Sequence, residues 1–278
     1  MASLAYGSVC LKEDKVCMKQ TDRATREVDH GRRLSLGDAE RTWGWNTPAG
    51  FHRASRRGRL IMEMSGMCPG KTVLEIGCGT GLFTEMFAKS GAHIVALDIS
   101  EDLLRKARAR NIPEQQVRFL AMSFEDESLL GHFDAVIGSS VLHHLNIRPA
   151  LKRIQSLLKP GAPMVFAEPN MLNPQIMIQK NIPWIKKKLG DSPDEGAFTI
   201  WSFHRMLLEA GFCSISIRPF DWLHPSTPPL FIPIISQLGN LLEKVPLVRH
   251  FAGSLLISTV CQPTYINSLA SERGTSRI

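Results

Sequence analysis

The most constraining feature of the sequence is a short aliphatic run that ends in three closely spaced glycines. Residues 73–76 have the pattern of a buried strand, Gly77, Gly79 and Gly81 follow at once, and residues 80–89 show helical spacing of apolar side chains. Glycine tolerates unusual φ angles and lets a ligand approach the backbone closely. A loop of this kind between a strand and a helix is typical of nucleotide-binding α/β folds, although a tight turn with close packing explains it equally well by itself.

Strand patterns and helix patterns alternate along the chain from Lys71 onward. Such alternation predicts βαβ crossovers and a largely parallel sheet with helices on both faces, which binds ligands beyond the carboxyl ends of its strands. We expect strands at residues 72–76, 93–97, 117–121, 133–137, 163–167, 214–217 and 255–260. The expected helices lie at residues 51–64, 80–89, 100–107, 148–158 and 199–210.

Two acidic residues accompany the glycine loop. Glu75 lies two residues before Gly77, where a ligand with an ammonium or sulfonium charge would account for a carboxylate. Asp98 ends the second expected strand, 21 residues after Gly77, where a carboxylate can accept both hydroxyls of a ribose. Leu82 occupies the position of the last glycine in a dinucleotide fingerprint, which disfavours a nicotinamide oxidoreductase.

These motifs resemble the first and second motifs of class I S-adenosylmethionine-dependent methyltransferases, in particular the small-molecule branch that includes quinone-biosynthesis enzymes. The resemblance covers roughly residues 50–220 and the final strand, and residues 133–145 and 157–163 resemble the family's fourth motif and the lead into its fifth strand. It implies an α/β, Rossmann-like sheet of seven mostly parallel strands, in the order 3-2-1-4-5-7-6 with the last strand antiparallel, and helices on both faces.

The resemblance also implies a set of cofactor-binding residues and no metal. It implies that the three glycines line the methionine and ribose portions of S-adenosyl-L-methionine, that Glu75 organises their loop, that Asp98 binds the ribose and that Ile99 packs on the adenine. Ser123 stands where the family usually has an acidic residue near the adenine amino group. The complete expected set is Glu75, Gly77, Cys78, Gly79, Gly81, Asp98, Ile99, Ser123, Phe124 and Ser139.

The catalytic candidates are polar residues that follow strands opening on the expected cleft. Methyl transfer is an in-line displacement, and a general base assists it when the acceptor is a hydroxyl. His143 and Glu168 are the candidates that we retain, Glu168 either orienting an acceptor or bonding to the backbone. We expect His144 and His204 to be structural residues.

The domain organisation follows from shifts in composition. We expect a mobile basic leader or an added helix at residues 1–40, an N-terminal helical cap at 41–70, the methyltransferase domain at 71–262 and a tail at 263–278. Apolar insertions at 171–198 and 220–252 suggest lids over a hydrophobic or amphiphilic acceptor, or surfaces that bury against each other or a second subunit. The apolar stretch at 228–242 is broken by prolines and amides, which favours a core or lid segment over membrane contact.

Composition restricts the partners and the compartment. Residues 1–60 carry 12 Lys and Arg against 7 Asp and Glu, and a basic leader of this kind is either solvated or contacts an anionic partner. Six cysteines without a C-x-x-C pair, and no secretory signal pattern, favour the reducing cytoplasm. We expect a small-molecule acceptor, no stable nucleic-acid partner, no transmembrane segment, possible peripheral membrane contact, and a monomer or homodimer.

Three other functions stay open at this level. An RNA or protein methyltransferase could share the cofactor site, although Gly138-Ser139-Ser140-Val141 lacks the Asn/Asp-Pro-Pro-aromatic turn of enzymes that methylate nucleic-acid amino groups. A non-catalytic S-adenosylmethionine-binding protein would also keep the glycine loop.

Overall fold

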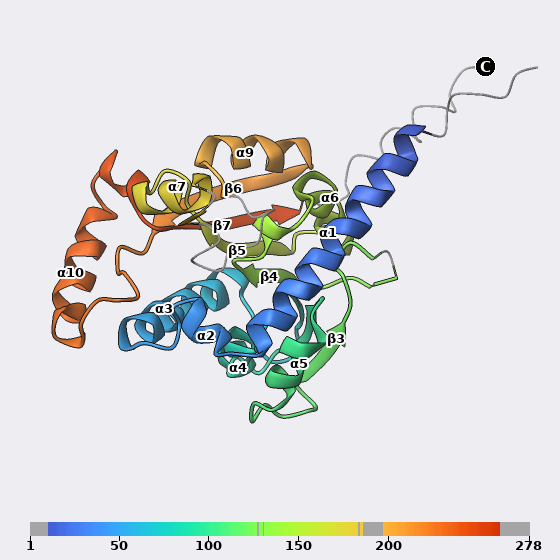
Figure 1. The fold of residues 1–278 in the computed structure, drawn as a ribbon, viewed down its shortest axis with the longest axis horizontal. Coiled ribbons are helices and arrows are strands. Elements are labelled where there is room, and N and C mark those ends of the chain that lie inside the picture. The colour runs from blue at the N-terminus through green and yellow to red at the C-terminus, as the bar shows by residue number, and fades with distance from the viewer. Residues whose placement is uncertain (1–10, 127, 130, 183, 186–196, 262–278) are drawn as a thin grey trace, which may run out of the picture.

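The computed structural model describes residues 11–126, 128–129, 131–182, 184–185 and 197–261, with the side chains of residues 11–22 and 261 left out. Its centre is a seven-stranded sheet in the order β3-β2-β1-β4-β5-β7-β6, in which β7 runs antiparallel to both neighbours (Figure 1). The strands are β1 Thr72–Ile76, β2 His93–Asp98, β3 Val117–Ala121, β4 Ala135–Ser139, β5 Pro163–Pro169, β6 Phe212–Phe220 and β7 Ser254–Cys261. The predicted fold class and strand order are therefore confirmed.

Helices connect these strands and precede the first of them. They are α1 Leu11–Ser35, α2 Ala39–Thr42, α3 Pro48–Ser65, α4 Leu82–Ala88, α5 Glu101–Arg108, α6 Ile147–Leu157, α7 Pro174–Asn181, α9 Ile200–Glu209 and α10 Ile232–Leu242, with 3-10 turns η1 Leu142–His144, η2 Pro229–Phe231 and η3 Val248–Phe251. Thr47, Ser100 and Thr199 each accept a backbone N–H with their side-chain oxygen, which fixes where α3, α5 and α9 begin.

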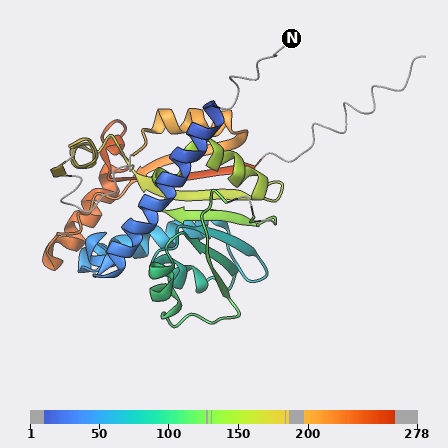
Figure 2. The same ribbon diagram turned by 45° about the vertical axis from the view of Figure 1, so that its right-hand side comes forward.

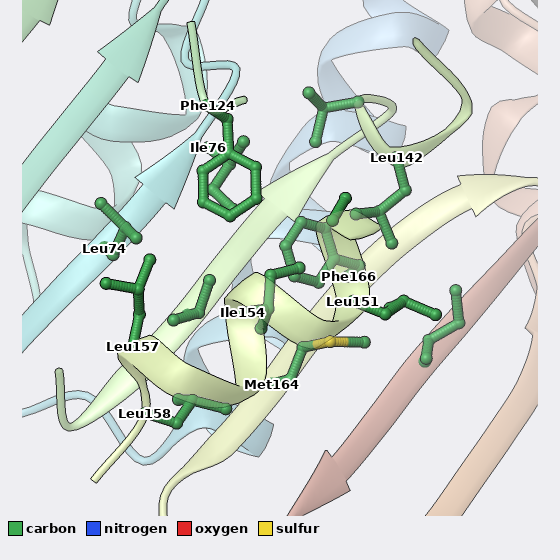
Figure 3. Close-up of a cluster of buried hydrophobic side chains, with 14 of the residues drawn as sticks. Leu74, Ile76, Phe124, Leu142, Leu151, Ile154, Leu157, Leu158, Met164 and Phe166 are labelled. Atoms are coloured by element: carbon green, nitrogen blue, oxygen red, sulfur yellow. The ribbon is translucent and has the colours of Figure 1, made fainter. Parts of the chain in front are cut away.

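The core consists of two layers because successive strand residues point to opposite faces of the sheet. Val73 belongs to the cluster that α3, α4 and α5 cover, and Leu74 belongs to the cluster that α6 and α9 cover. Figure 3 shows this second cluster, in which Ile154 and Leu157 of α6 pack over Met164 and Phe166. Burial on both faces explains why the inner strands have continuous apolar sequences.

Strands β4 and β6 differ most from their predicted bounds. Phe133 makes only an isolated bridge with Leu158, so β4 begins two residues later than expected. Strand β6 is longer than expected and contains an irregularity between Cys213 and Ser216. Residues 11–35, for which we expected a leader or an added helix, form α1, which packs along α5 (Figures 1 and 2). The predicted tail at 263–278, and residues 183 and 186–196 of the insertion predicted at 171–198, lie outside the described residues.

The apolar stretch at 228–242 forms η2 and α10, and it contributes little to the core. Leu230, Ile234, Leu238 and Leu241 are all exposed. The expectation of a core segment is therefore wrong for these side chains. In the described part of the chain, no helix is both long and apolar enough to cross a membrane.

Candidate functional site

A cavity of about 640 Å³ opens where four parallel strands end. Ile76, Asp98, Ser139 and Pro169, the last residues of β1, β2, β4 and β5, all line it. In an open α/β sheet this edge is the ligand-binding position, because the connections that follow neighbouring β1 and β4 leave toward opposite faces of the sheet there. The cavity is therefore the candidate active site.

The glycine loop forms the floor of this cavity and is tightly enclosed. Gly77 and Gly79 have φ angles of 68° and 54°, in the left-handed region that favours glycine. A Cβ on Gly77 would lie 2.3 Å from a methyl group of Val141, and one on Gly79 would lie 3.2 Å from the ring of Trp43. Both glycines are thus required by conformation and by space, and the loop backbone faces the cavity without side chains.

Asp98 closes the other side of the loop. One carboxylate oxygen accepts the N–H of Gly79 at 2.8 Å and the other accepts that of Ser100 at 2.8 Å. Burial raises the pKa of Asp98, and these two amides oppose that shift. Each carboxylate oxygen has a second lone pair, so Asp98 can still accept hydrogen bonds from a ligand in the cavity.

Glu75 is buried beneath the loop and does not line the cavity. Burial raises its pKa to about 8, and its Oε2 atom has no hydrogen-bond partner among the described residues. An unpartnered buried carboxyl is costly, so a feature of this kind indicates a role other than stability.

His143 and Glu168 form a buried pair at the cavity wall. The His143 Nδ1 atom lies 2.6 Å from Oε2 of Glu168, whose other oxygen accepts the N–H groups of Val141 and Leu142 at 2.9 Å each. Burial alone would raise the pKa of Glu168, but His143 and these amides outweigh it and the pKa is lowered. Burial, with nearby His144, lowers the pKa of His143.

A neutral imidazole beside an ionised carboxylate has a defined tautomer. Nδ1 carries the proton and donates it to Glu168, which leaves the lone pair on Nε2. His143 lines the cavity, whereas Glu168 stands behind it. The pair can therefore present one basic nitrogen to a bound acceptor.

Arg57 is a cavity residue that the sequence analysis missed. It is 2% exposed, and its guanidinium donates to the hydroxyls of Ser140 at 2.9 Å and Ser254 at 2.5 Å, with Ser139 at 3.2 Å. Its Nε atom has no hydrogen-bond partner in the part of the chain that the structure describes, and burial lowers the pKa of this guanidinium to about 10. The spacing in the sequence could have predicted its burial, since Arg57 lies on the same face of α3 as buried Ala54 and Ile61.

Residues N-terminal to the sheet form the upper wall of the cavity. The guanidinium groups of Arg53 and Arg57 each lie 5.1 Å from the centroid of the Trp45 ring, a cation–π distance. Arg53 also pairs with Asp221 at 2.8 Å. From α1, Glu27 contacts Nδ1 of His144 at 3.0 Å, so this histidine is joined to the helix above the site.

The structure brings most of the predicted site residues into one cavity. Lining it are Gly77, Cys78, Gly79, Asp98, Ile99, Ser123, Phe124, Ser139 and His143. Glu75, Gly81 and Glu168 are outside the lining, and exposed His204 of α9 is outside it as well. Within the ranges described, no group of three His, Cys, Asp or Glu side chains could hold a metal ion.

Comparison with known proteins agrees with this geometry. Residues 74–164 match the methyltransferase-domain family. The ubiquinone biosynthesis O-methyltransferase of Xanthomonas campestris pv. campestris is 37% identical over 106 residues, which are 37% of this chain and 44% of that protein. The chain spans about half the length, between 44% and 64%, of such curated relatives.

Solved structures extend the likeness of the fold over most of the chain. A Haloferax volcanii methyltransferase, in complex with the Trm112 methyltransferase activator, has a TM-score of 0.61 at 18% identity and covers 84% of this chain and 97% of its own. The N-methyltransferase NodS of Bradyrhizobium japonicum, solved with S-adenosyl-L-homocysteine, has a TM-score of 0.57 at 16% identity, over 85% and 98% of the two chains.

The fold is the Rossmann-like fold of these methyltransferase structures, and residues 74–164 within it match the methyltransferase-domain family. The resemblance to class I S-adenosylmethionine-dependent methyltransferases of the quinone-biosynthesis type is thereby confirmed.

Proposed function

We propose that this chain is an enzyme that transfers a methyl group from S-adenosylmethionine to a small hydrophobic or amphiphilic acceptor. The observation that carries the proposal is the convergence of the glycine loop, Asp98 and the His143–Glu168 pair on one cavity. The relatives that act in quinone biosynthesis support an acceptor of small-molecule type.

The residues of the cavity fit the chemical groups of this donor. Arg57 is a buried cation that donates its hydrogen bonds to neutral serine hydroxyls, so it suits the methionine carboxylate. Asp98 retains lone pairs for the ribose hydroxyls, and Ile99 and Phe124 offer apolar surface for the adenine. Glu75 is buried beneath the loop with its Oε2 atom unpartnered among the described residues, and a positively charged ligand would favour the ionised form of this carboxyl.

When bound, the donor supplies an electrophilic methyl group on a sulfonium centre. The chain then has to hold the acceptor in line with that methyl group and to remove a proton if the acceptor is a hydroxyl. We assign the proton to Nε2 of His143, since Glu168 occupies Nδ1. Glu168 is a positioning residue that fixes the tautomer of this histidine.

Aromatic and apolar side chains support an acceptor of low polarity. Trp45, Trp222 and Pro225 line the cavity, and Ile176 of α7 adds to them. The Trp222 indole N–H is buried without a partner among the described residues, so an acceptor oxygen could receive it.

Two measurements test this proposal. Calorimetry with S-adenosylhomocysteine should give binding, which Asp98→Asn weakens about tenfold or more and exposed Asp126→Asn leaves unchanged. Labelled donor with fractionated lipid extract should then give a labelled product that partitions into organic solvent. Absence of binding heat with well-folded protein would overturn the proposal, and label in RNA or protein fractions would favour the alternatives.

Compartment and assembly complete the proposal. The described cysteines Cys68, Cys78 and Cys213 are free, which supports a reducing cytoplasm. A monomer or homodimer stays our expectation for the oligomeric state, and light scattering on the full chain measures it.

A further inference from the structure

An uncovered apolar stripe follows one side of α10. Ile234, Leu238 and Leu241 are 66%, 52% and 59% exposed, and their spacing of four and three residues puts them on one face of the helix. Gly239 faces inward, where a Cβ would lie 3.0 Å from that of Trp222. The helix is thus anchored through its small residue and presents its large aliphatic residues outward.

The apolar surface continues beyond both ends of the helix. Leu230 and Phe231 precede it, and Val245, Leu247 and Phe251 follow it, all exposed. A contiguous patch of this extent marks an interaction site, whereas single exposed leucines are ordinary on protein surfaces.

The charges around this stripe have one dominant sign. α10 contains no charged residue, and residues 222–251 contain Lys244 and Arg249 but only one acid, Glu243. Both carboxylate oxygens of Glu243 are bound by Arg56 of α3, at 2.8 and 2.7 Å. The remaining basic rim complements an anionic surface, and basic residues bordering an apolar helix face are typical of interfacial helices.

The insertion that carries the stripe is tied to the mouth of the cavity. Residues 222–226, which lead into η2 and α10, line the cavity together with Gln179 and Lys180 of α7. The side chains of Asn170 and Asn173, on either side of the turn into α7, donate to the backbone carbonyls of His250 and Phe251 at 2.8 Å each. These hydrogen bonds join the start of α7 to the end of the insertion, and the two segments lie side by side in Figures 1 and 2.

We propose that α10 and its flanking turns dock this protein on the surface of a bilayer that contains anionic phospholipid. The aliphatic stripe enters the boundary between headgroups and acyl chains, and Lys244 and Arg249 contact the phosphates. This arrangement brings the cavity mouth to the lipid surface. The further consequence, that an apolar acceptor enters from the membrane, rests on the proposed function; the docking itself does not.

Vesicle sedimentation of the full chain tests the docking. The protein should pellet with vesicles of equal parts phosphatidylcholine and phosphatidylglycerol, more weakly with phosphatidylcholine alone and more weakly at high salt. Leu238→Glu should lower the apparent affinity for these vesicles about tenfold or more. It removes a leucine that enters the bilayer and adds a negative charge near anionic lipid. Leu208→Glu is the matched control, because Leu208 is 56% exposed on α9, outside both the stripe and the cavity lining.

The controls separate this proposal from its rivals and from the proposed function. Both variants should keep the circular dichroism spectrum and the S-adenosylhomocysteine affinity of the unmodified chain. Failure of the folded, unmodified protein to pellet with either vesicle would overturn the docking, whatever calorimetry shows for the donor. Dimerisation in the absence of lipid that Leu238→Glu abolishes would also overturn it and would assign the stripe to a second copy.

Discussion

Arg57 contributes a buried positive charge to the active-site cavity, and we assign it to the carboxylate of the donor. Its three serine partners carry no charge, and the negative charges of Asp221 and Glu168 act on it without a hydrogen bond among the described residues, so a bound anion can pair with it directly. Arg57→Gln should weaken S-adenosylhomocysteine binding about tenfold to a hundredfold, as measured by calorimetry.

A ligand without a carboxylate provides the control for this substitution. Methylthioadenosine shares the adenosine part and cannot pair with Arg57, so its affinity should be the same in the variant and in the unmodified protein. An equal loss for both ligands would show that the side chain holds the cavity together and does not read the carboxylate.

The His143–Glu168 pair makes a second prediction at this scale. Burial keeps the pKa of His143 below its ordinary 6.5, so the imidazole is neutral at pH 7 and is lost as a base only as the pH falls through that lowered pKa. His143→Gln should reduce kcat about 10²–10⁴-fold for a hydroxyl acceptor.

Glu168→Gln should reduce kcat as well, because the preferred tautomer is lost, and should move the acidic limb of the pH–rate profile to lower pH. S-adenosylhomocysteine affinity serves as the reference, since neither residue is assigned to the donor. An unchanged turnover in His143→Gln would remove this histidine from the mechanism.

The glycine loop and Asp98 could be predicted from the sequence because their chemistry is local. A strand end, three glycines and a carboxylate at a fixed distance need no knowledge of the rest of the chain. Arg57 and Trp45 were missed because they reach the site through the packing of α3 across the sheet. Glu75 was predicted among the cofactor residues. Its position behind the loop depends on which face of the sheet its side chain points to, and that is decided by the strand.

At the scale of elements, α1 covers the site by packing against α5. Gly31 allows this approach, since a Cβ there would lie 2.5 Å from the Cβ of Ser100. Ser100 is buried, caps α5 and donates its N–H to Asp98, so the contact leads directly to the residue that we propose binds the ribose.

Gly31→Ala should therefore lift α1 from the site although alanine is the better helix former. Overpacking costs about 1–3 kcal/mol, which should appear as weaker S-adenosylhomocysteine binding and faster proteolysis within α1. Gly37→Ala is the matched control, since nothing lies within 4 Å of a Cβ at that position. Equal behaviour of the two variants would contradict a role of this contact in binding.

The elements of the sheet were easier to predict than the covers. Buried parallel strands such as β1 and β5 are mostly apolar, apart from Glu75 and Glu168 near their ends, and the helices between the strands show regular spacing of apolar residues. The sequence alone therefore predicts both the type and the order of these elements. α10 is equally apolar, and nothing in its composition distinguishes a helix that faces the core from one that faces outward. That difference arises from Gly239, which selects the face that packs on Trp222.

At the scale of the whole molecule, the candidate site buries ionisable groups whose desolvation lowers the free energy of unfolding. Glu75 has its pKa raised to about 8, against 4.5 in the unfolded chain, so the folded state holds a proton that the unfolded state releases. The destabilisation of the fold by Glu75 is absent below pH 4.5 and grows as the pH rises toward 8. The fold therefore carries a stability penalty at neutral and alkaline pH that comes from its ligand-binding edge.

This penalty predicts how thermal stability depends on pH. Between pH 7 and pH 9 the Glu75 carboxyl loses its proton in the folded state, which should lower the free energy of unfolding by roughly 1 kcal/mol, or about 2–4 °C in Tm. In Glu75→Gln the corresponding fall should be smaller by that amount, because the amide does not titrate. Differential scanning calorimetry of both proteins at the two pH values measures the difference, and parallel curves would show that the Glu75 carboxyl is already ionised at pH 7.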